Sequence, residues 1–147
     1  MKPKYKMLLR GLLILLLVAT GLVWYIFTEK FSDTAESKAD YTLNAMNFIK
    51  EFQQNDSLAN KKYTEKIISI RGAISEIETA DTSVNIKMAD TATGDYIIFA
   101  FQEQHLAEAK KLKKGDDVSI KGSCSGAVYS EILETRYISF KRAALDK

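Results

Sequence analysis

Side chains that commonly carry out chemistry are scarce in this 147-residue chain. His105 is its only histidine and Cys124 its only cysteine, which excludes a multi-histidine metal site and a disulfide within the chain. His105 lies between Glu103 and Glu108 in a segment with a helical pattern, and no motif pairs it with a nucleophile. We therefore expect His105 to be a solvated surface residue rather than a catalytic base.

Cys124 stands between two serines in a predicted strand, so we expect a small, buried or half-buried thiol. The alternative is a reactive thiol or an intermolecular disulfide, if the domain faces an oxidising compartment. Asp116 and Asp117 favour a solvated turn over a cation site. The chain contains no P-loop, GxGxxG, GxSxG or HExxH motif. We therefore expect no catalysis, no metal and no cofactor, and a hydrolase is the least favoured alternative.

The charge is concentrated at the N-terminus. Residues 1–10 hold four bases and no acid, whereas the rest of the chain has a net charge of −2. One dense basic run occurs later, and we expect it to be a solvated helix end rather than a phosphate or anionic-lipid site. Its members are Lys110, Lys111, Lys113 and Lys114.

An uncharged run of 17 residues, Gly11–Phe27, follows the basic tail. A helix over residues 7–27 would be roughly 30 Å long, which matches the hydrocarbon core of a bilayer. Arg10 lies near one end, and Trp24 and Tyr25 lie near the other, where such side chains favour the headgroup region. The sequence thus predicts a cytoplasmic tail over residues 1–6, a transmembrane anchor over 7–27 and a linker over 28–36.

A cleaved signal peptide is the alternative, because a basic start before an apolar run is also its pattern. The run is longer than the usual ~7–15 residues and ends without an A-x-A-like site, which favours an uncleaved anchor. No cysteine is present there for lipid attachment. The positive flank then predicts a single-pass protein of the inner membrane, with a cytoplasmic N-terminus and a periplasmic or extracellular domain. The bilayer is one expected partner, and an envelope protein is a candidate for another.

The segment 37–63 shows helical periodicity. A helix is predicted over Ser37–Gln54 with Ser37 as its cap, because its apolar residues trace one face. These are Tyr41, Ala45, Phe48, Ile49 and Phe52. A second short helix is predicted over Ser57–Tyr63. An isolated helix of this length is marginal in water, so we expect the segment to pack on the following domain.

Residues 64–147 change to a period of two, which indicates strands. The predicted order is three strands, a helix and two strands, and Gly72 predicts a bulge or bend in the first strand. That order is the order of the five-stranded OB barrel, so the expected fold is mainly β with helices. The strands are predicted at Lys66–Glu78, Ser83–Met88, Asp95–Phe101, Asp117–Ser125 and Glu131–Lys141, and the helix at Glu103–Lys114.

Two stretches, Lys61–Gly72 and Gly115–Gly126, resemble the small bacterial proteins of the tRNA_anti-like family. The second stretch carries the most specific spacing, which consists of Gly115, Val118, Lys121, Gly122, Cys124 and Gly126. The resemblance covers roughly Asp40–Phe140. It implies an OB fold preceded by a helix and an N-terminal anchor or signal. The family name records a likeness to anticodon-binding domains, so nucleic-acid binding enters as an alternative function.

An OB barrel binds ligands on the face around its second and third strands. If the apolar residues of these strands point inward, the candidate binding face consists of Ser69, Arg71, Asn85, Lys87, Tyr96 and Ile98. This face has one aromatic ring and two bases, on a domain with 12 bases and 13 acids, whereas single-strand binding requires stacking rings and a positive groove. We therefore expect a membrane-anchored binding or interaction module and no nucleic-acid partner, with single-strand binding as the alternative. Ligand identity and oligomeric state are left open.

Overall fold

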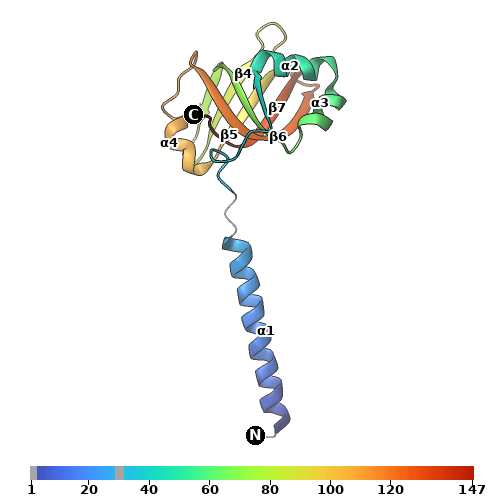
Figure 1. Cartoon of the computed structure of the whole chain (residues 1–147), viewed down its shortest axis with the longest axis vertical. Coiled ribbons are helices and arrows are strands. Elements are labelled where there is room, and N and C mark those ends of the chain that lie inside the picture. Colours follow the sequence, from blue (N-terminus) through green and yellow to red (C-terminus); the bar gives the residue numbers. More distant parts are fainter. Residues whose placement is uncertain (1–2, 29–31) are drawn as a thin grey trace. The chain divides into compact units, whose positions relative to one another are not determined.

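The computed structural model describes residues 3–28 and 32–147, which form two units, Met1–Ser32 and Asp33–Lys147. In the first unit, α1 (Pro3–Thr28) is a single helix with no buried residue (Figure 1). Its length and composition suffice to cross a membrane, and a signal sequence would also meet this criterion. Of the predicted tail and linker, residues 1–2 and 29–31 lie outside the described residues.

The second unit contains a sheet with short helices around it (Figure 1). The first elements are β1 (Tyr41–Asn44), α2 (Ala45–Gln54), α3 (Asp56–Tyr63), β2 (Ile67–Ala73) and β3 (Glu76–Thr79). They are followed by β4 (Val84–Ala89), β5 (Tyr96–Phe101), the 3-10 helix η1 (Glu103–His105), α4 (Leu106–Ala109), β6 (Asp117–Ser130) and β7 (Thr135–Leu145). The strand order in the sheet is β1-β2-β6-β7-β5-β4-β3.

This sheet corresponds to the predicted OB barrel, in which the first strand is bent and divided into β2 and β3. Only Ile74 and Ser75 separate β2 from β3, and both residues continue the hydrogen bonding. The Ile74 amide donates to the Asp116 carbonyl at 2.9 Å, and the Ser75 amide donates to the Lys87 carbonyl at 2.8 Å. Strands β2 and β3 therefore form the first barrel strand, which pairs with β6 at one end and β4 at the other. Strand β1 is an addition that pairs with β2 in parallel.

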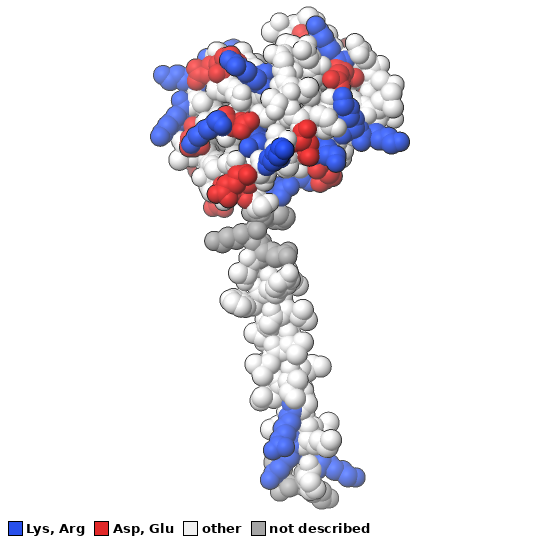
Figure 2. Space-filling view, viewed as in Figure 1, with Lys and Arg blue, Asp and Glu red and all other residues white. Residues whose placement is uncertain are grey.

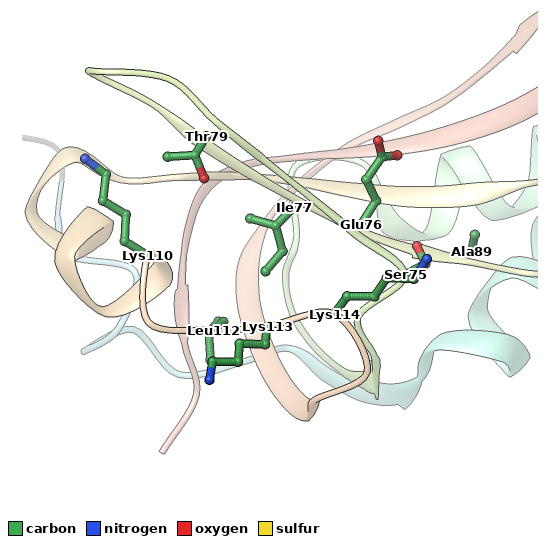
Figure 3. Close-up of a pocket in the computed structure, with 9 residues that line it drawn as sticks. All are labelled: Ser75, Glu76, Ile77, Thr79, Ala89, Lys110, Leu112, Lys113 and Lys114. Carbon is green, nitrogen blue, oxygen red and sulfur yellow. The ribbon is translucent and has the colours of Figure 1, made fainter.

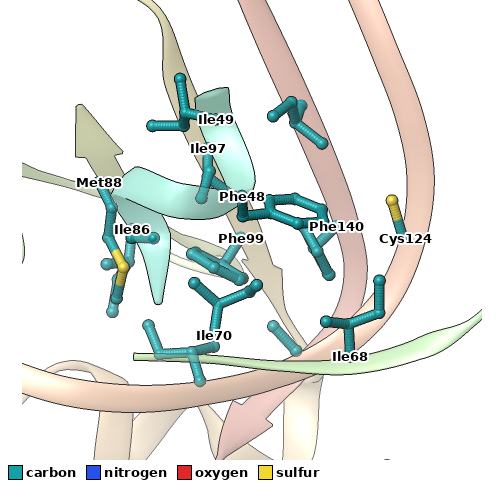
Figure 4. Close-up of a cluster of buried hydrophobic side chains, with 14 of the residues drawn as sticks. Phe48, Ile49, Ile68, Ile70, Ile86, Met88, Ile97, Phe99, Cys124 and Phe140 are labelled. Carbon is teal, nitrogen blue, oxygen red and sulfur yellow. The ribbon is translucent and has the colours of Figure 1, made fainter. Parts of the chain in front are cut away.

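The inward alternation predicted for the two central strands is confirmed. The buried residues are Val84, Ile86 and Met88 on β4 and Ile97, Phe99 and Phe101 on β5. Helix α2 contributes Phe48, Ile49 and Phe52 to the same core. Figure 4 shows Phe48 among the side chains of the barrel strands, and its ring lies 5.8 Å from that of Phe140.

The prediction of a helix from Ser37 was wrong in its first turns. Helix α2 begins at Ala45, and the side chain of Asn44, rather than Ser37, caps it by accepting from the Met46 amide. Tyr41–Asn44 form β1 instead, because Asp40 binds the start of β2 twice. Its amide donates to the Ile67 carbonyl, and its carboxylate accepts from the Ile67 amide.

The helix predicted over Glu103–Lys114 ends much earlier than expected. It consists of η1 and α4, so Lys110–Lys114 follow the helix rather than forming its end. The Gly115 amide donates to the Ile74 carbonyl at 2.8 Å, and Gly115 has a φ of +93°. These contacts draw the segment onto the barrel, which overrides the helical propensity of its lysines.

Strand β6 is longer than predicted, and β7 has the predicted length but lies further along the chain. Strand β6 continues to Ser130, whereas β7 begins at Thr135, four residues later than expected. The residues between them form the turn of a hairpin, in which Glu134 adopts a positive φ of 52°.

Residues 33–37, which we call the strap, differ from the polar linker predicted over 28–36. Thr34 is buried, and its amide donates to the Gln102 side chain at 3.4 Å. Asp33 contacts His105 at the start of the short helices. The strap is therefore part of the barrel unit and is held on it from Asp33 onward.

Candidate functional site

Four of the six predicted binding residues lie together on the outer side of the barrel. Asn85 and Lys87 are on β4, Tyr96 and Ile98 are on β5, and all four are half-buried. Lys87 is the cross-strand partner of Ile98, and Ala89 is the partner of Tyr96. Because partners in a ladder point to the same side, these residues form a continuous surface.

Strand β7 adds a second aromatic ring, which is absent from the predicted binding face. Tyr137 pairs with Tyr96 across the parallel β5–β7 ladder, and the two rings stack with centroids 5.9 Å apart at 20°. Val128 of β6 is the next partner along this row. We call Lys87, Tyr96, Ile98, Val128 and Tyr137 the tyrosine face. The alternation of Tyr137 with the buried Ile138 and Phe140 was a signal for its outward position.

The positive charge on this face is compensated. The Lys87 ammonium lies 5.4 Å from the centre of the Tyr96 ring and forms ion pairs with Glu76 at 3.2 Å and with Glu78. The hydrogen bond to Glu78, aided by Glu76, raises the pKa of Lys87 despite its partial burial. The face is thus an aromatic surface with little free charge, suited to flat or apolar groups.

Ser69 and Arg71 do not join this surface, because β2 is separated from β4 and β5 in the sheet order. Ser69 is buried and donates to the Asp146 carboxylate, so it does not have the outward, exposed position that was predicted. Lys121 also binds Asp146, at 3.2 Å. Burial raises the pKa of Asp146, but these two partners outweigh it and leave that pKa lowered. Arg71 is exposed and pairs with Asp117 at 3.1 Å.

His105 is not the solvated residue that the sequence predicts. Its side chain is half-buried, with Nε2 2.7 Å from a carboxylate oxygen of Asp33 and Nδ1 3.9 Å from Glu108. The hydrogen bond from His105, followed by that from the Ala35 amide, lowers the pKa of Asp33. Asp33 and His105 lie 72 positions apart in the sequence, so the residues around His105 gave no signal for this contact. His105 fixes the strap to the barrel.

Cys124 is buried, as expected for a small core thiol. Burial raises its pKa to about 11, which removes the reactive thiolate at neutral pH. Asp116 lies in the turn before β6, where its carboxylate accepts from the Lys113 amide at 2.9 Å. Across residues 3–28 and 32–147, no group of three or more His, Cys, Asp or Glu side chains could hold a metal ion.

The β6–β7 hairpin presents apolar side chains beside the tyrosine face. Ile132 is 93% exposed and Leu133 is 63% exposed at its tip. Tyr129 is also exposed, and the Arg136 guanidinium lies 5.9 Å from its ring. In an OB barrel this hairpin is one of the loops that flank the ligand-binding face.

The tRNA_anti-like family model matches residues 1–134, from the basic tail through β6. The chain belongs to the tRNA_anti-like family. The match starts well before Asp40 and so includes the apolar helix, and it ends before β7. In this family member, Tyr137 therefore lies on a strand outside the matched region.

A solved structure supports the fold of this tRNA_anti-like protein. A Klebsiella pneumoniae lipoprotein, named as a candidate nucleic acid-binding protein, has a TM-score of 0.56 and 19% identity over 71% of this chain and 91% of its own. A weaker likeness, from which nothing is argued, is to a candidate aspartyl-tRNA synthetase from Leishmania major, with a TM-score of 0.46 and 7% identity over 80% of this chain and 22% of its own. No curated protein has a sequence that matches this chain.

Proposed function

We propose that this protein is a non-catalytic binding module, anchored in the inner membrane by α1 and displaying its barrel on the non-cytoplasmic side. One observation carries the anchor. Helix α1 is uncharged from Gly11 to Phe27, none of its residues is buried, and its bases gather at one end (Figure 2).

The physical argument is the cost of exposing this helix to water. Each large apolar side chain that leaves water contributes about 1.5–3 kcal/mol, and Leu12–Leu17 alone supply six. A bilayer supplies the apolar environment that a helix of this length and composition requires. Lys4, Lys6 and Arg10 favour the cytoplasm, and Trp24 and Tyr25 suit the opposite headgroup region.

The tyrosine face supports the binding role. It offers two stacked rings and Ile98 on a rigid sheet, next to the exposed hairpin tip. Two side chains could in principle act as nucleophiles. They are Ser69, which lies beside Lys121 and Asp146, and Cys124, and both are buried. Neither is accessible as a nucleophile, whereas a stacked aromatic pair requires no chemistry to hold a ligand.

The anchor is tested by carbonate extraction of membranes, followed by intact-mass measurement of the extracted chain. We expect the full-length mass in the membrane pellet. A Leu15→Arg, Leu16→Arg variant should move to the soluble fraction, because each arginine at the centre of a span costs about 2.5–3.5 kcal/mol. The control Leu58→Arg, on an exposed position of α3, should remain in the pellet. A soluble chain shortened at its N-terminus would overturn the anchor.

Single-stranded nucleic acid is a second candidate ligand, favoured by the stacked Tyr96 and Tyr137. Base stacking on an aromatic side chain is worth about 1–3 kcal/mol per base. The test titrates the full chain in uncharged detergent with labelled single strands at low salt. Affinity tighter than about 100 μM, a steep salt dependence and loss in Tyr96→Leu would support it. Unchanged binding in that variant would exclude the tyrosine face as the site.

A further inference from the structure

A second surface feature lies between β3 and the segment that follows α4. It is an open pocket of about 750 Å³ (Figure 3). One wall comes from the first barrel strand and β4, with Ser75, Glu76, Ile77, Thr79 and Ala89. The other wall comes from the segment that follows α4, with Lys110, Leu112, Lys113 and Lys114. None of these residues belongs to the tyrosine face.

The pocket is positively charged. Lys110, Lys113 and Lys114 are exposed, and within the described part of the chain none of their ammonium groups forms an ion pair. The one carboxylate on the wall, Glu76, is already paired with Lys87 at 3.2 Å. Three ammonium groups within five residues are therefore available to a ligand, and they favour an anion.

Apolar side chains complete the lining. Ile77 of β3 and Leu112 of the opposite wall are half-buried, and Figure 3 shows both within the pocket. The lining contains no aromatic ring. A nucleic-acid strand would gain phosphate contacts here but no base stacking. A ligand that carries both an anionic group and an apolar portion matches both kinds of lining.

The basic wall is held in place by the backbone. Gly115 donates to the Ile74 carbonyl, and the Asp116 carbonyl accepts from the Ile74 amide. The Asp116 carboxylate also accepts from the Lys113 amide at 2.9 Å. These bonds fix the lysine segment beside β3, so that Lys110, Lys113 and Lys114 all line one pocket.

We propose that this pocket binds an anionic amphiphile. Lys110, Lys113 and Lys114 hold its phosphate group, and its apolar portion lies against Ile77 and Leu112. The chemistry fits the headgroup region of an anionic phospholipid, and it also fits a water-soluble organic phosphate. The two ligands can be distinguished, because only the affinity for the phospholipid depends on an apolar chain.

The test uses the full chain in uncharged dodecyl maltoside, with the methyl groups of Ile77 and Leu112 as NMR probes. The titrants are dihexanoylphosphatidylglycerol, its zwitterionic phosphatidylcholine counterpart and glycerol phosphate. We expect saturable methyl shifts with phosphatidylglycerol and weaker binding of the other two. A Lys110→Gln, Lys113→Gln, Lys114→Gln variant should bind phosphatidylglycerol at least about tenfold more weakly, because hydrogen bonds to charged groups are lost.

The matched control is Lys50→Gln, Lys61→Gln, Lys66→Gln, which removes the same charge from exposed positions that do not line the pocket. This control should bind as the wild type does. Equal weakening in both variants would reveal a general attraction to charged micelles and overturn the pocket. Equal affinity for glycerol phosphate would overturn the apolar contact and assign a water-soluble phosphate. Displacement of the lipid by an oligonucleotide would overturn the proposal in favour of nucleic acid.

Discussion

The ring of Phe48 on α2 lies 5.8 Å from the ring of Phe140 on β7, although 92 positions separate them in the chain. Phe48 also meets Phe52 and Tyr63 edge to face. The helices before the barrel thus share its core rather than forming a spacer. We propose that the strap, α2, α3 and the barrel unfold as one cooperative unit.

Phe48→Ala should lower the free energy of unfolding by about 3–5 kcal/mol, because the buried ring leaves a cavity. Urea unfolding of the full chain in uncharged detergent, followed by circular dichroism, measures this change. The control Leu58→Ala, on an exposed position of α3, should change it by less than about 0.5 kcal/mol. An unchanged midpoint with Phe48→Ala, together with unprotected amides over residues 45–54, would show that α2 is not part of the unit.

Gly72→Ala should destabilise the barrel by about 1–3 kcal/mol through overpacking. A Cβ at this position would lie 2.7 Å from the Cβ of Ala45 and 3.1 Å from the sulfur of Met88. The double variant Gly72→Ala, Ala45→Gly should recover part of that loss, since it removes the closer contact. The same urea experiment measures both. Equal stability of Gly72→Ala and wild type would mean that α2 does not approach β2 this closely.

The strap contact predicts a dependence on acid pH. His105 and the Ala35 amide lower the pKa of Asp33 below its ordinary value of 3.8. The stabilisation is therefore fully present above about pH 3.8 and is lost as the pH falls through the lowered folded-state value. Carbon NMR of the Asp33 carboxyl should show a midpoint below 3.8, which moves upward in His105→Ala. A midpoint unaffected by that substitution would contradict the contact.

Cys124 should resist thiol reagents while the protein is folded. A pKa of about 11 against the ordinary 9.0 leaves about 100-fold less thiolate at neutral pH, and burial restricts access further. Maleimide labelling followed by mass spectrometry should therefore be slow in buffer and fast in urea. Rapid labelling of the folded chain would contradict the buried position and restore the reactive-thiol alternative.

The barrel was predictable mainly from β4 and β5, whose sequences alternate, and their buried residues are those that the period of two selects. Strand β1 was not predictable. Tyr41 fits both a helical spacing to Ala45 and an alternation with Leu43, and only the pairing with β2 decides between them. The early end of α4 was not predictable either. Long-range hydrogen bonds to Ile74 hold the following segment on the barrel, although its sequence favours a helix.

The candidate site was predictable only in part. The outward residues of β4 and β5 followed from the alternation, but Tyr137 joined them through a parallel ladder that no local pattern specifies. Ser69 has the outward parity of a strand residue and is nevertheless buried, because the C-terminal Asp146 returns to bind it. Long-range contacts decide such positions, so a single sequence does not reveal them.

Cysteine accessibility in spheroplasts tests the central claim, an anchored barrel on the non-cytoplasmic side, most directly. Wild-type Cys124 is buried and supplies the background. A membrane-impermeant maleimide should label Ile132→Cys, at the exposed hairpin tip, in intact spheroplasts. It should label Lys4→Cys, on the basic end of α1, only after lysis. Labelling of Lys4→Cys before lysis, or protection of Ile132→Cys until lysis, would contradict the account.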